Sequence, residues 1–136
     1  MIYFSKPDGD YGFLCNDYSS EFRIVGNVYS SVTEYLNIVK EKIRSSGAPD
    51  WEEIWNYSQE STLRTVLFEK FRQNPKLAQA LLNTGSSLLC YCSSNEYWGI
   101  GLRSNNPDIH NMSKWTGKNR LGHCLMSVRD VLRYTF

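Results

Sequence analysis

The sequence predicts a helix-rich α+β fold with a small β-sheet, formed by a single domain over residues 1–136. Several long stretches carry apolar side chains three or four residues apart, which is typical of amphipathic helices. The other apolar stretches are short, rich in aromatic or β-branched residues and bounded by Gly, Asn or Asp, as strands are. The chain length fits one domain with one moderate core.

Short strands are expected near the N-terminus and after the middle of the chain. Residues 2–4 read as a strand, and residues 21–25 alternate between apolar and polar side chains in the manner of a second strand. Gly26-Asn27 is expected to turn that strand into residues 28–29. Residues 88–92 form an apolar run that predicts a buried strand.

Helices are expected in the middle of the chain. Ser31 and Glu34 have the S-x-x-E spacing of a capping box, so a helix should run to about Arg44, with Tyr35, Leu36, Val39 and Ile43 on one face. A second box at Asp50 predicts a short helix through Trp55. A longer helix should follow over about residues 58–72.

Two further helices complete the predicted order. Asn74-Pro75 reads as a cap followed by Pro at the first helical position, where its missing N–H costs nothing. A long polar loop should span residues 103–118. The last helix is expected over about residues 120–134, with its apolar side chains turned inward.

Composition excludes some classes of partner. Hydrophobic residues make up 41% of the chain and charged residues 21%, as in ordinary globular proteins, and 15 basic residues balance 14 acidic ones. This balance does not favour nucleic acid or a membrane surface as an electrostatic partner. No apolar run approaches the roughly 20 residues that span a bilayer, and the first residues do not resemble a signal peptide. We therefore expect a cytoplasmic protein with no membrane partner.

Metal-binding residue types are few: Cys15, Cys90, Cys92, Cys124, His110 and His123. Cys90 and Cys92 are separated by one residue, which is closer than zinc ligands usually stand and places them on opposite faces of a strand. The histidines form no ligand pair with them by spacing. We expect reduced, structural cysteines, no metal site and no cofactor.

Short motifs follow one another along nearly the whole chain: Tyr11-Gly12-Phe13-Leu14-Cys15-Asn16, Tyr35 with Lys40, Trp55, Leu67 to Asn74, Thr84-Gly85, Tyr97-Trp98-Gly99-Ile100-Gly101 and Gly117-Lys118-Asn119-Arg120-Leu121-Gly122. In this order and at these separations they resemble the NADAR (YbiA-like) domain family of N-glycosidases. The resemblance implies cleavage of a bond between a ribose anomeric carbon and a nitrogen. Family substrates include ribosylated aminopyrimidines of riboflavin synthesis and ADP-ribose attached to guanine.

The resemblance implies substrate-binding roles for a set of amide, aromatic, glycine and basic residues: Asn16, Tyr35, Trp55, Tyr97, Trp98, Gly99, Gly101, Lys118 and Asn119. Each role has a structural alternative. Trp55 can stack on the base or fill the core, and Asn16 can hold the ligand or form a turn. Residues 98–101 can present backbone N–H groups or simply make a tight turn. The start of the last helix can attract an anion, or Asn119 can cap it.

Acidic residues expected from the family pattern are replaced at three positions, which here hold Thr33, Cys90 and Asn95. We predict Glu34, Thr33 and Asn95 as the candidate catalytic residues. Glu34 follows the replaced position directly, but it can also serve only to close the capping box with Ser31.

Two other acidic residues, Asp17 and Glu60, can replace the lost charge or lie on the solvated surface. Two functions therefore remain open. One is an N-glycosidase-like domain acting on a ribosylated base, and the other is a catalytically inactive module that binds ADP-ribose or a nucleotide. A structural protein without a pocket is a third alternative. The expected partner is a small nucleoside or ADP-ribose-type ligand, free or carried on modified nucleic acid, and the sequence predicts no oligomeric state.

Overall fold

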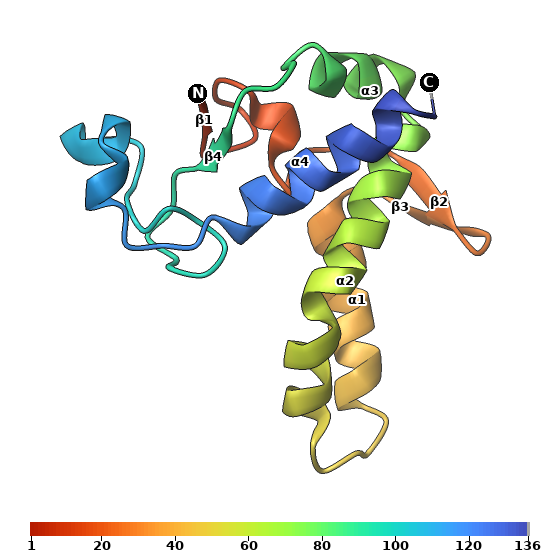
Figure 1. Ribbon diagram of the computed structural model, residues 1–136. Helices are drawn as coiled ribbons and strands as arrows, with labels where there is room; N and C mark the ends of the chain where they lie inside the picture. The colour runs from red at the N-terminus through yellow and green to blue at the C-terminus, as the bar shows by residue number, and fades with distance from the viewer. Residues whose placement is uncertain (136) are drawn as a thin grey trace.

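The computed structural model describes residues 1–135 and confirms a helix-rich α+β fold in which all strands are short (Figure 1). The predicted first strand is β1 (Ile2–Phe4), and it pairs in parallel with β4 (Leu89–Tyr91), with Ile2 opposite Leu89. Parallel strands need a crossover connection. Here that connection holds the β2–β3 hairpin and three of the four α-helices.

The predicted hairpin is present as β2 (Phe22–Ile24) and β3 (Asn27–Tyr29), but its turn lies one residue earlier than expected. Val25 and Gly26 form the turn, with φ angles of 49° and 79°. Two positive φ angles match the right-handed twist of a two-residue hairpin loop. A β-branched residue is unfavourable there, which is why the sequence pointed to Gly26-Asn27 instead.

Helix α1 (Val32–Arg44) begins at the predicted cap. The Ser31 side chain accepts a hydrogen bond of 3.1 Å from the Glu34 backbone N–H. The return bond of a capping box is absent, because the Glu34 carboxylate accepts instead from the backbone N–H and the hydroxyl of Ser30. Ser31 therefore caps the helix, and the Glu34 carboxylate is bonded to Ser30 and not to the predicted partner Ser31.

Helix α2 (Trp51–Arg72) is one continuous helix, so the prediction of two helices was wrong. Trp, Asn, Tyr and Ser at positions 55–58, where the two predicted helices meet, are weak helix formers. None of them stops the helix, and the Ser58 hydroxyl bonds back to the Ile54 carbonyl within it. The Asp50 side chain makes no cap bond, so the second capping box is not formed, and α2 packs against α1.

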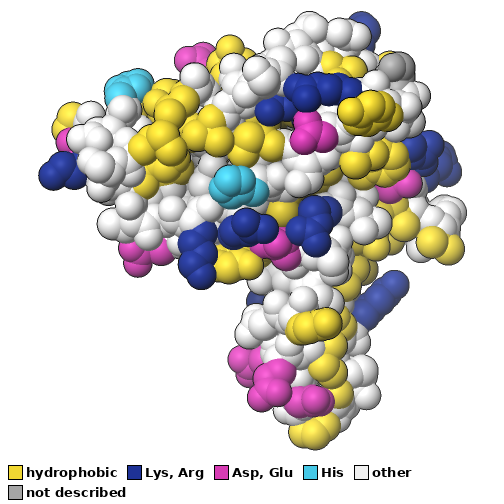
Figure 2. Space-filling view, in the orientation of Figure 1, with side chains coloured by type: hydrophobic (Ala, Val, Ile, Leu, Met, Phe, Trp, Pro, Cys, Tyr) yellow, Lys and Arg dark blue, Asp and Glu magenta, His cyan; other side chains and the backbone are white. Residues whose placement is uncertain are grey.

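Helices α1 and α2 form a hairpin that projects from the rest of the molecule (Figure 1). The predicted inward face of α1 is therefore only half buried. The one fully buried residue of this helix is Val32, at its first position. Figure 2 shows acidic side chains gathered toward the hairpin tip, where Glu52 and Glu53 lie in the first turn of α2. Within residues 1–135, no helix combines the length and the apolar character needed to cross a membrane.

Helix α3 (Pro75–Leu82) starts at Pro75 as predicted, although Asn74 does not cap it. The Asn74 amide donates instead to the carbonyls of Glu21 and Lys70. These bonds tie the start of α3 to the residue before β2 and to the end of α2. Helix α4 (Arg120–Arg133) crosses α2 (Figure 1).

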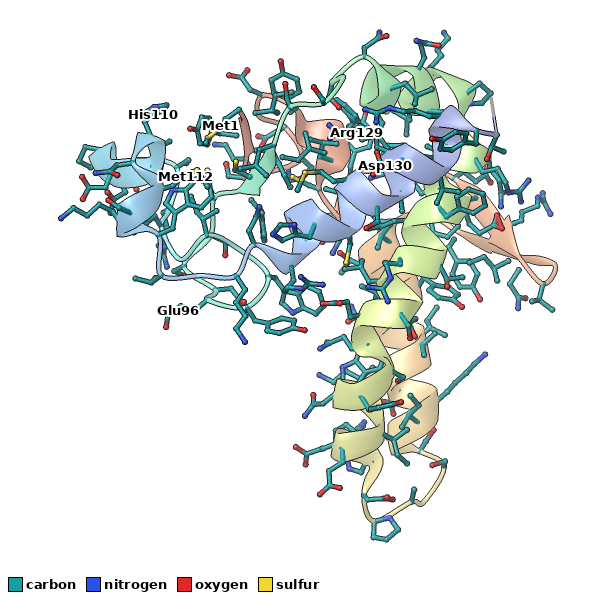
Figure 3. All side chains as sticks on the ribbon, viewed as in Figure 1. Met1, Glu96, His110, Met112, Arg129 and Asp130 are labelled. Atoms are coloured by element: carbon teal, nitrogen blue, oxygen red, sulfur yellow. The ribbon has the colours of Figure 1, made fainter. Side chains whose placement is uncertain are left out.

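The predicted inward residues of α4 are buried in the core together with residues of α2, α3 and the strands: Phe4, Phe22, Leu63, Val66, Leu67, Phe71, Leu81, Leu89, Leu121, Leu125, Val128 and Leu132. Arg129, labelled in Figure 3, is also buried and donates to the Thr84 hydroxyl and the Ser87 carbonyl. It thereby fixes α4 to the segment between α3 and β4.

Three short 3₁₀ helices occupy predicted loops: η1 (Gly12–Leu14), η2 (Pro107–His110) and η3 (Met112–Lys114). The last two give the expected 103–118 loop a small core of its own, in which Cys90, Cys92, Ile100 and Ile109 are buried. All four cysteines are free and buried, as expected of structural thiols.

Candidate functional site

A cavity of about 260 Å³ opens where Asn16, which follows η1, meets helices α1, α2 and α4, the end of β4 and the loop after it. We call it the inner cavity. Its lining combines amides, hydroxyls and large apolar groups: Asn16, Leu36, Gln59, Leu63, Tyr91, Ser93, Asn95, Trp98 and Leu121. No residue of this lining carries a formal charge.

A second cavity of about 320 Å³, the outer cavity, adjoins the first. The two share Gln59, Asn95 and Trp98, so together they form one cleft. The outer cavity differs from the inner one in that a charged residue, Glu60, lines it together with Tyr97. The cleft thus has an uncharged inner part and a charged outer part, a layout that suits a ligand with a planar apolar end and a hydrophilic end.

Asn16 has a polar atom without a partner. Its Oδ1 is buried and accepts no hydrogen bond within the described residues, although the residue lines the inner cavity. Most buried side-chain oxygens in folded proteins are hydrogen-bonded, and leaving one unbonded costs about 1–3 kcal/mol. An N–H or O–H group of a ligand in the inner cavity would satisfy this oxygen.

The backbone around Asn16 is firmly held. Lys70 of α2 is completely buried, and its Nζ donates to the carbonyls of Phe13 at 2.7 Å and Cys15 at 3.1 Å. Burial lowers the pKa of Lys70 to about 8. The Asn16 carbonyl in turn accepts from the Thr33 backbone N–H at 3.1 Å. The unsatisfied side chain is therefore part of a fixed segment.

Asn95 holds the loop that carries Trp98. Its Oδ1 accepts from the backbone N–H groups of Tyr97 at 2.9 Å and Trp98 at 2.8 Å. An Asp side chain has the same oxygen, so the loop requires an acceptor at this position and not a charge. Asn95 therefore meets the requirement of the loop, and its amide also supplies an N–H donor at a residue that lines both cavities.

The start of α4 does not form the anion site that the sequence suggested. The backbone N–H groups of Lys118, Asn119, Arg120 and Leu121 donate to the carbonyls of residues 96, 99, 97 and 98 in turn. A helix N-terminus binds anions through unpaired N–H groups. These are already paired with the Trp98 loop, so they position Trp98.

Asn119 also differs from its predicted role as a cap. It has a left-handed φ of 54° and makes no side-chain cap bond. Its Oδ1 accepts from the Tyr91 N–H and its Nδ2 donates to the Leu89 carbonyl, both at 2.9 Å. The side chain, 3% exposed, thus extends the edge of β4 and does not face a ligand.

The glycines of the predicted motif serve close packing. A Cβ at Gly99 would lie 2.8 Å from the Ser93 Cβ, and one at Gly101 would lie 2.0 Å from the Thr116 hydroxyl. The Gly99 N–H is bonded to the Asn95 carbonyl. Of the alternatives stated for residues 98–101, the tight turn is the one that these contacts support.

Glu60 is the carboxylate that lines the outer cavity, and its oxygens are fully used. Arg120 donates to both oxygens at 2.9 Å, Tyr97 donates its hydroxyl at 3.0 Å, and Arg64 lies at 3.1 Å. Hydrogen bonds, from Arg120 above all, hold the pKa of Glu60 at about 2 despite its partial burial. Glu60 therefore fixes Tyr97 in place and is a poor base.

Other acids near the motifs face elsewhere. Glu96 points away from the molecule at the edge of the Trp98 loop (Figure 3). Glu34 lines a separate hollow with Tyr29 and Ser30, and hydrogen bonds from Ser30 lower its pKa. Thr33 lies closer to the cleft, since it contacts the Asn16 backbone, and its hydroxyl donates to the Asp17 carboxylate.

The predicted site residues are thus only partly brought together. Asn16, Asn95 and Trp98 line the inner cavity and Tyr97 lines the outer one. Trp55 is buried and lines neither, which is the core alternative stated for it. Tyr35 packs edge-on against Tyr29 with ring centroids 4.9 Å apart.

Several lining residues were missed from the sequence: Leu36, Gln59, Leu63, Tyr91, Ser93 and Leu121. One signal was available for Gln59 and Leu63. They follow Trp55 by one and two helical turns, so a continuous α2 places them on the face of Trp55. The predicted break in this helix concealed that relation.

Among residues 1–135, no three His, Cys, Asp or Glu side chains are grouped to hold a metal ion. Burial raises the pKa of the thiols of Cys15, Cys90 and Cys124 to about 11. A raised pKa suppresses the thiolate form that metals and electrophiles require. These three cysteines therefore pack as small apolar residues.

Comparison with known proteins relates the chain to N-glycosidases. The family model described as NADAR domain matches residues 40–133. A riboflavin biosynthesis protein of Vibrio vulnificus is 32% identical over 97% of this chain and 38% of its own length. N-glycosidase R617 of Acanthamoeba polyphaga mimivirus is 44% identical over 45% of this chain and 36% of its own length. The chain therefore spans less than half the length of these two relatives.

YbiA is similar over its greater part. N-glycosidase YbiA of Escherichia coli (strain K12) is 26% identical over 97% of this chain and 88% of its own length. The NMR structure of the E. coli protein YbiA superimposes on 98% of this chain and 86% of that chain, with a TM-score of 0.71 and 24% identity. At this identity the superposition establishes a shared fold.

Proposed function

Because the chain belongs to the NADAR domain family, we propose that it is an N-glycosidase that cleaves a ribosylated base, with the inner cavity as the base-binding site. The observation that carries this proposal is the buried, unpartnered Oδ1 of Asn16 in that cavity. A base edge offers N–H donors that can satisfy it.

The lining of the inner cavity suits a flat, uncharged group. Trp98 supplies an indole, and Leu36 and Leu63 supply apolar surface. Gln59, Ser93 and the Asn95 amide can exchange hydrogen bonds with a base edge. Ligand pockets commonly measure about 300–1,000 Å³. At about 260 Å³ the inner cavity lies just below this range, so it holds the base and the adjoining ribose, and the phosphate extends into the outer cavity.

The outer cavity suits the hydrophilic part of such a substrate. Tyr97 lines it, and the Lys118 Nζ lies 5.6 Å from the Tyr97 ring centroid. The Lys118 ammonium group can bind a phosphate on the ribose. It does so as a single positive charge and not as a bidentate hydrogen-bond donor. The substrate is thus a phosphorylated ribosylaminouracil or an ADP-ribosylated guanine, the two substrate types that the family resemblance implies.

The reaction builds positive charge on the ribose as the C–N bond breaks, as in other glycoside cleavages. Binding of the base in an uncharged cavity favours its departure as a neutral molecule after protonation. Of the predicted catalytic residues, Thr33 and Asn95 carry no charge and Glu34 lies in a separate hollow. In this proposal Asn95 acts on the base and the other two do not act on the reacting atoms.

Release of the free base tests the proposal. The purified chain is incubated with each substrate type, and the base is quantified by chromatography. We expect release by the wild type and a loss of at least tenfold in Trp98→Leu. Trp51→Leu is the matched control, since Trp51 lies at the hairpin tip in a different hollow. Equal activity of the wild type and Trp98→Leu would exclude the inner cavity as the site.

A binding module that does not cleave its ligand is the second candidate. It is favoured by one observation, the absence of a charged residue among those that line the inner cavity. It predicts that ADP-ribose raises the melting temperature, because a ligand that prefers the native state stabilises it, while no base is released. Turnover of either substrate type would rule it out.

A further inference from the structure

We infer that Asp17 is the catalytic carboxylate of the site: it accepts a proton from the water that attacks the ribose in the inner cavity. This inference rests on the proposed N-glycosidase function. It concerns an exposed residue that lines neither cavity, so its position relative to the inner cavity has to be established from its neighbours.

Two contacts place the Asp17 carboxylate at the rim of the inner cavity. Asp17 directly follows Asn16, whose side chain lines that cavity. Its Oδ1 accepts a hydrogen bond from the Thr33 hydroxyl, and Thr33 precedes the cavity residue Leu36 by about one helical turn. Asp17 therefore lies between the Asn16 segment and the start of α1, and these two elements contribute Asn16 and Leu36 to the cavity lining.

The electrostatics of Tyr91 agree with this position. Tyr91 lines the inner cavity, and burial is the main cause that raises its pKa. The negative charge of Asp17 contributes in the same direction. Asp17 thus lies close enough for its charge to act on a hydroxyl group in the cavity lining.

Asp17 also differs from the other acids in what its oxygens do. Both oxygens of Glu60 are bonded to Arg120, and Glu34 is bonded to Ser30 on another face. In the described chain, Oδ1 of Asp17 is bonded to Thr33 and Oδ2 makes no hydrogen bond. The Thr33 bond fixes the carboxylate, and the second oxygen is left to bind water.

The step balances without a cofactor. The bond between the ribose anomeric carbon and the base nitrogen breaks, and its electron pair leaves with the base. A water oxygen forms the new bond to the anomeric carbon, and one water proton passes to Asp17. The departing nitrogen gains one proton from solvent, and Asp17 later returns its proton to solvent. The products are the free base and the free sugar.

The substitution Asp17→Asn tests the assignment, because it keeps the shape and the Thr33 bond but removes the base. We expect kcat to fall by at least about 100-fold, within the range for loss of a general base. The affinity for the product ribose phosphate, measured by Trp fluorescence, should stay within about threefold, since the same hydrogen-bonding shape is retained. Asp108→Asn, which makes the same change on η2 away from the cleft, should retain full activity.

Transfer of the carboxylate separates catalysis from folding. Because the Thr33 hydroxyl already touches the Asp17 carboxylate, a Glu at position 33 can reach the same space. The double variant Asp17→Asn with Thr33→Glu should therefore recover at least about tenfold of the lost kcat, as expected when a general base is returned to the same place. A merely structural role of Asp17 predicts no recovery.

The outcomes distinguish this inference from the proposed function. Loss in Asp17→Asn with recovery in the double variant supports it. Normal turnover by Asp17→Asn, or loss in Glu34→Gln instead, overturns the role of Asp17 while the N-glycosidase function stands. Absence of base release by the wild type overturns both.

Discussion

The two walls of the inner cavity use their polar groups in different ways. One wall, the Trp98 wall, is held by hydrogen bonds to its backbone. It comprises Tyr91, Ser93, Asn95, Trp98 and Leu121. Asn95 and Asn119 accept hydrogen bonds from backbone N–H groups of this wall, and the start of α4 donates four N–H groups to the carbonyls of residues 96–99. The Asn16 wall comprises Asn16, Leu36, Gln59 and Leu63, and there the Asn16 Oδ1 is buried without a partner.

This difference separates scaffold from recognition. At the Trp98 wall, the side-chain oxygens of Asn95 and Asn119 are bonded to the backbone, so their loss should destabilise the protein. On the Asn16 wall, the backbone is held by Lys70 and the side-chain oxygen is spare. Its loss should weaken ligand binding and leave the fold intact. Asparagines of the same chemistry thus have opposite predicted effects.

The largest effect is expected at Asn119. Asn119→Leu should lower the free energy of unfolding by about 4 kcal/mol, because it removes two buried hydrogen bonds and places a branched side chain at positive φ. Urea denaturation measures this loss. Asn119→Gly tolerates the backbone angle and should lose only about 2 kcal/mol. Equal losses would show that the φ angle contributes nothing.

The Lys70 anchor of the Asn16 wall should come next. Lys70→Ala leaves the Phe13 carbonyl unpaired, removes one of the two hydrogen bonds to the Cys15 carbonyl and opens a cavity, so we expect a loss of about 3 kcal/mol in urea denaturation. Lys40 is an exposed lysine of α1, and Lys40→Ala should change stability by less than about 0.5 kcal/mol. A neutral effect of Lys70→Ala would mean that solvent replaces the amine.

The Glu60 network should show in the pH dependence of stability. The folded pKa of about 2 lies below the ordinary 4.5, so this carboxylate contributes stability that is fully present above pH 4.5 and is lost as pH falls toward 2. Glu60→Gln should cost about 2 kcal/mol at pH 7. Its melting temperature should also fall less steeply than that of the wild type over this acid range. Parallel melting curves would contradict the role of Glu60.

The smallest effect should have the opposite sign. Asn16→Leu replaces an unbonded buried oxygen with an apolar group of similar size, so the ligand-free protein should gain about 1 kcal/mol. Calorimetric affinity for the ribosylated base should fall at the same time. A gain in stability together with a loss of affinity would show that Asn16 lowers the stability of the free protein in return for ligand binding. A loss of stability would instead indicate that an ordered water satisfies the oxygen.

Local patterns in the sequence predicted much of the fold. The Ser31 cap, the Pro75 start of α3 and the buried face of α4 are set by residues within a few positions of one another. The continuous α2 was missed, because weak helix propensity at residues 55–58 is outweighed by packing against α1. The turn lies at Val25–Gly26 and not at the predicted Gly26-Asn27, because the strand register pairs Ile24 with Asn27. Here too, pairing between segments outweighs the preference of a single residue.

The sequence by itself determined the fold class, the family and the residues Asn16, Asn95, Tyr97 and Trp98 of the cleft, because these lie in short motifs with fixed spacing. Only the tertiary structure decided which polar atoms remain free. Asn119 and the N–H groups of α4 are bonded to partners about 20 or more residues away, and the partner of Asp17 is 16 residues away. A hydrogen bond between distant segments leaves no periodic trace in the sequence, so the difference between a scaffold amide and a recognition amide appears only when the chain is folded.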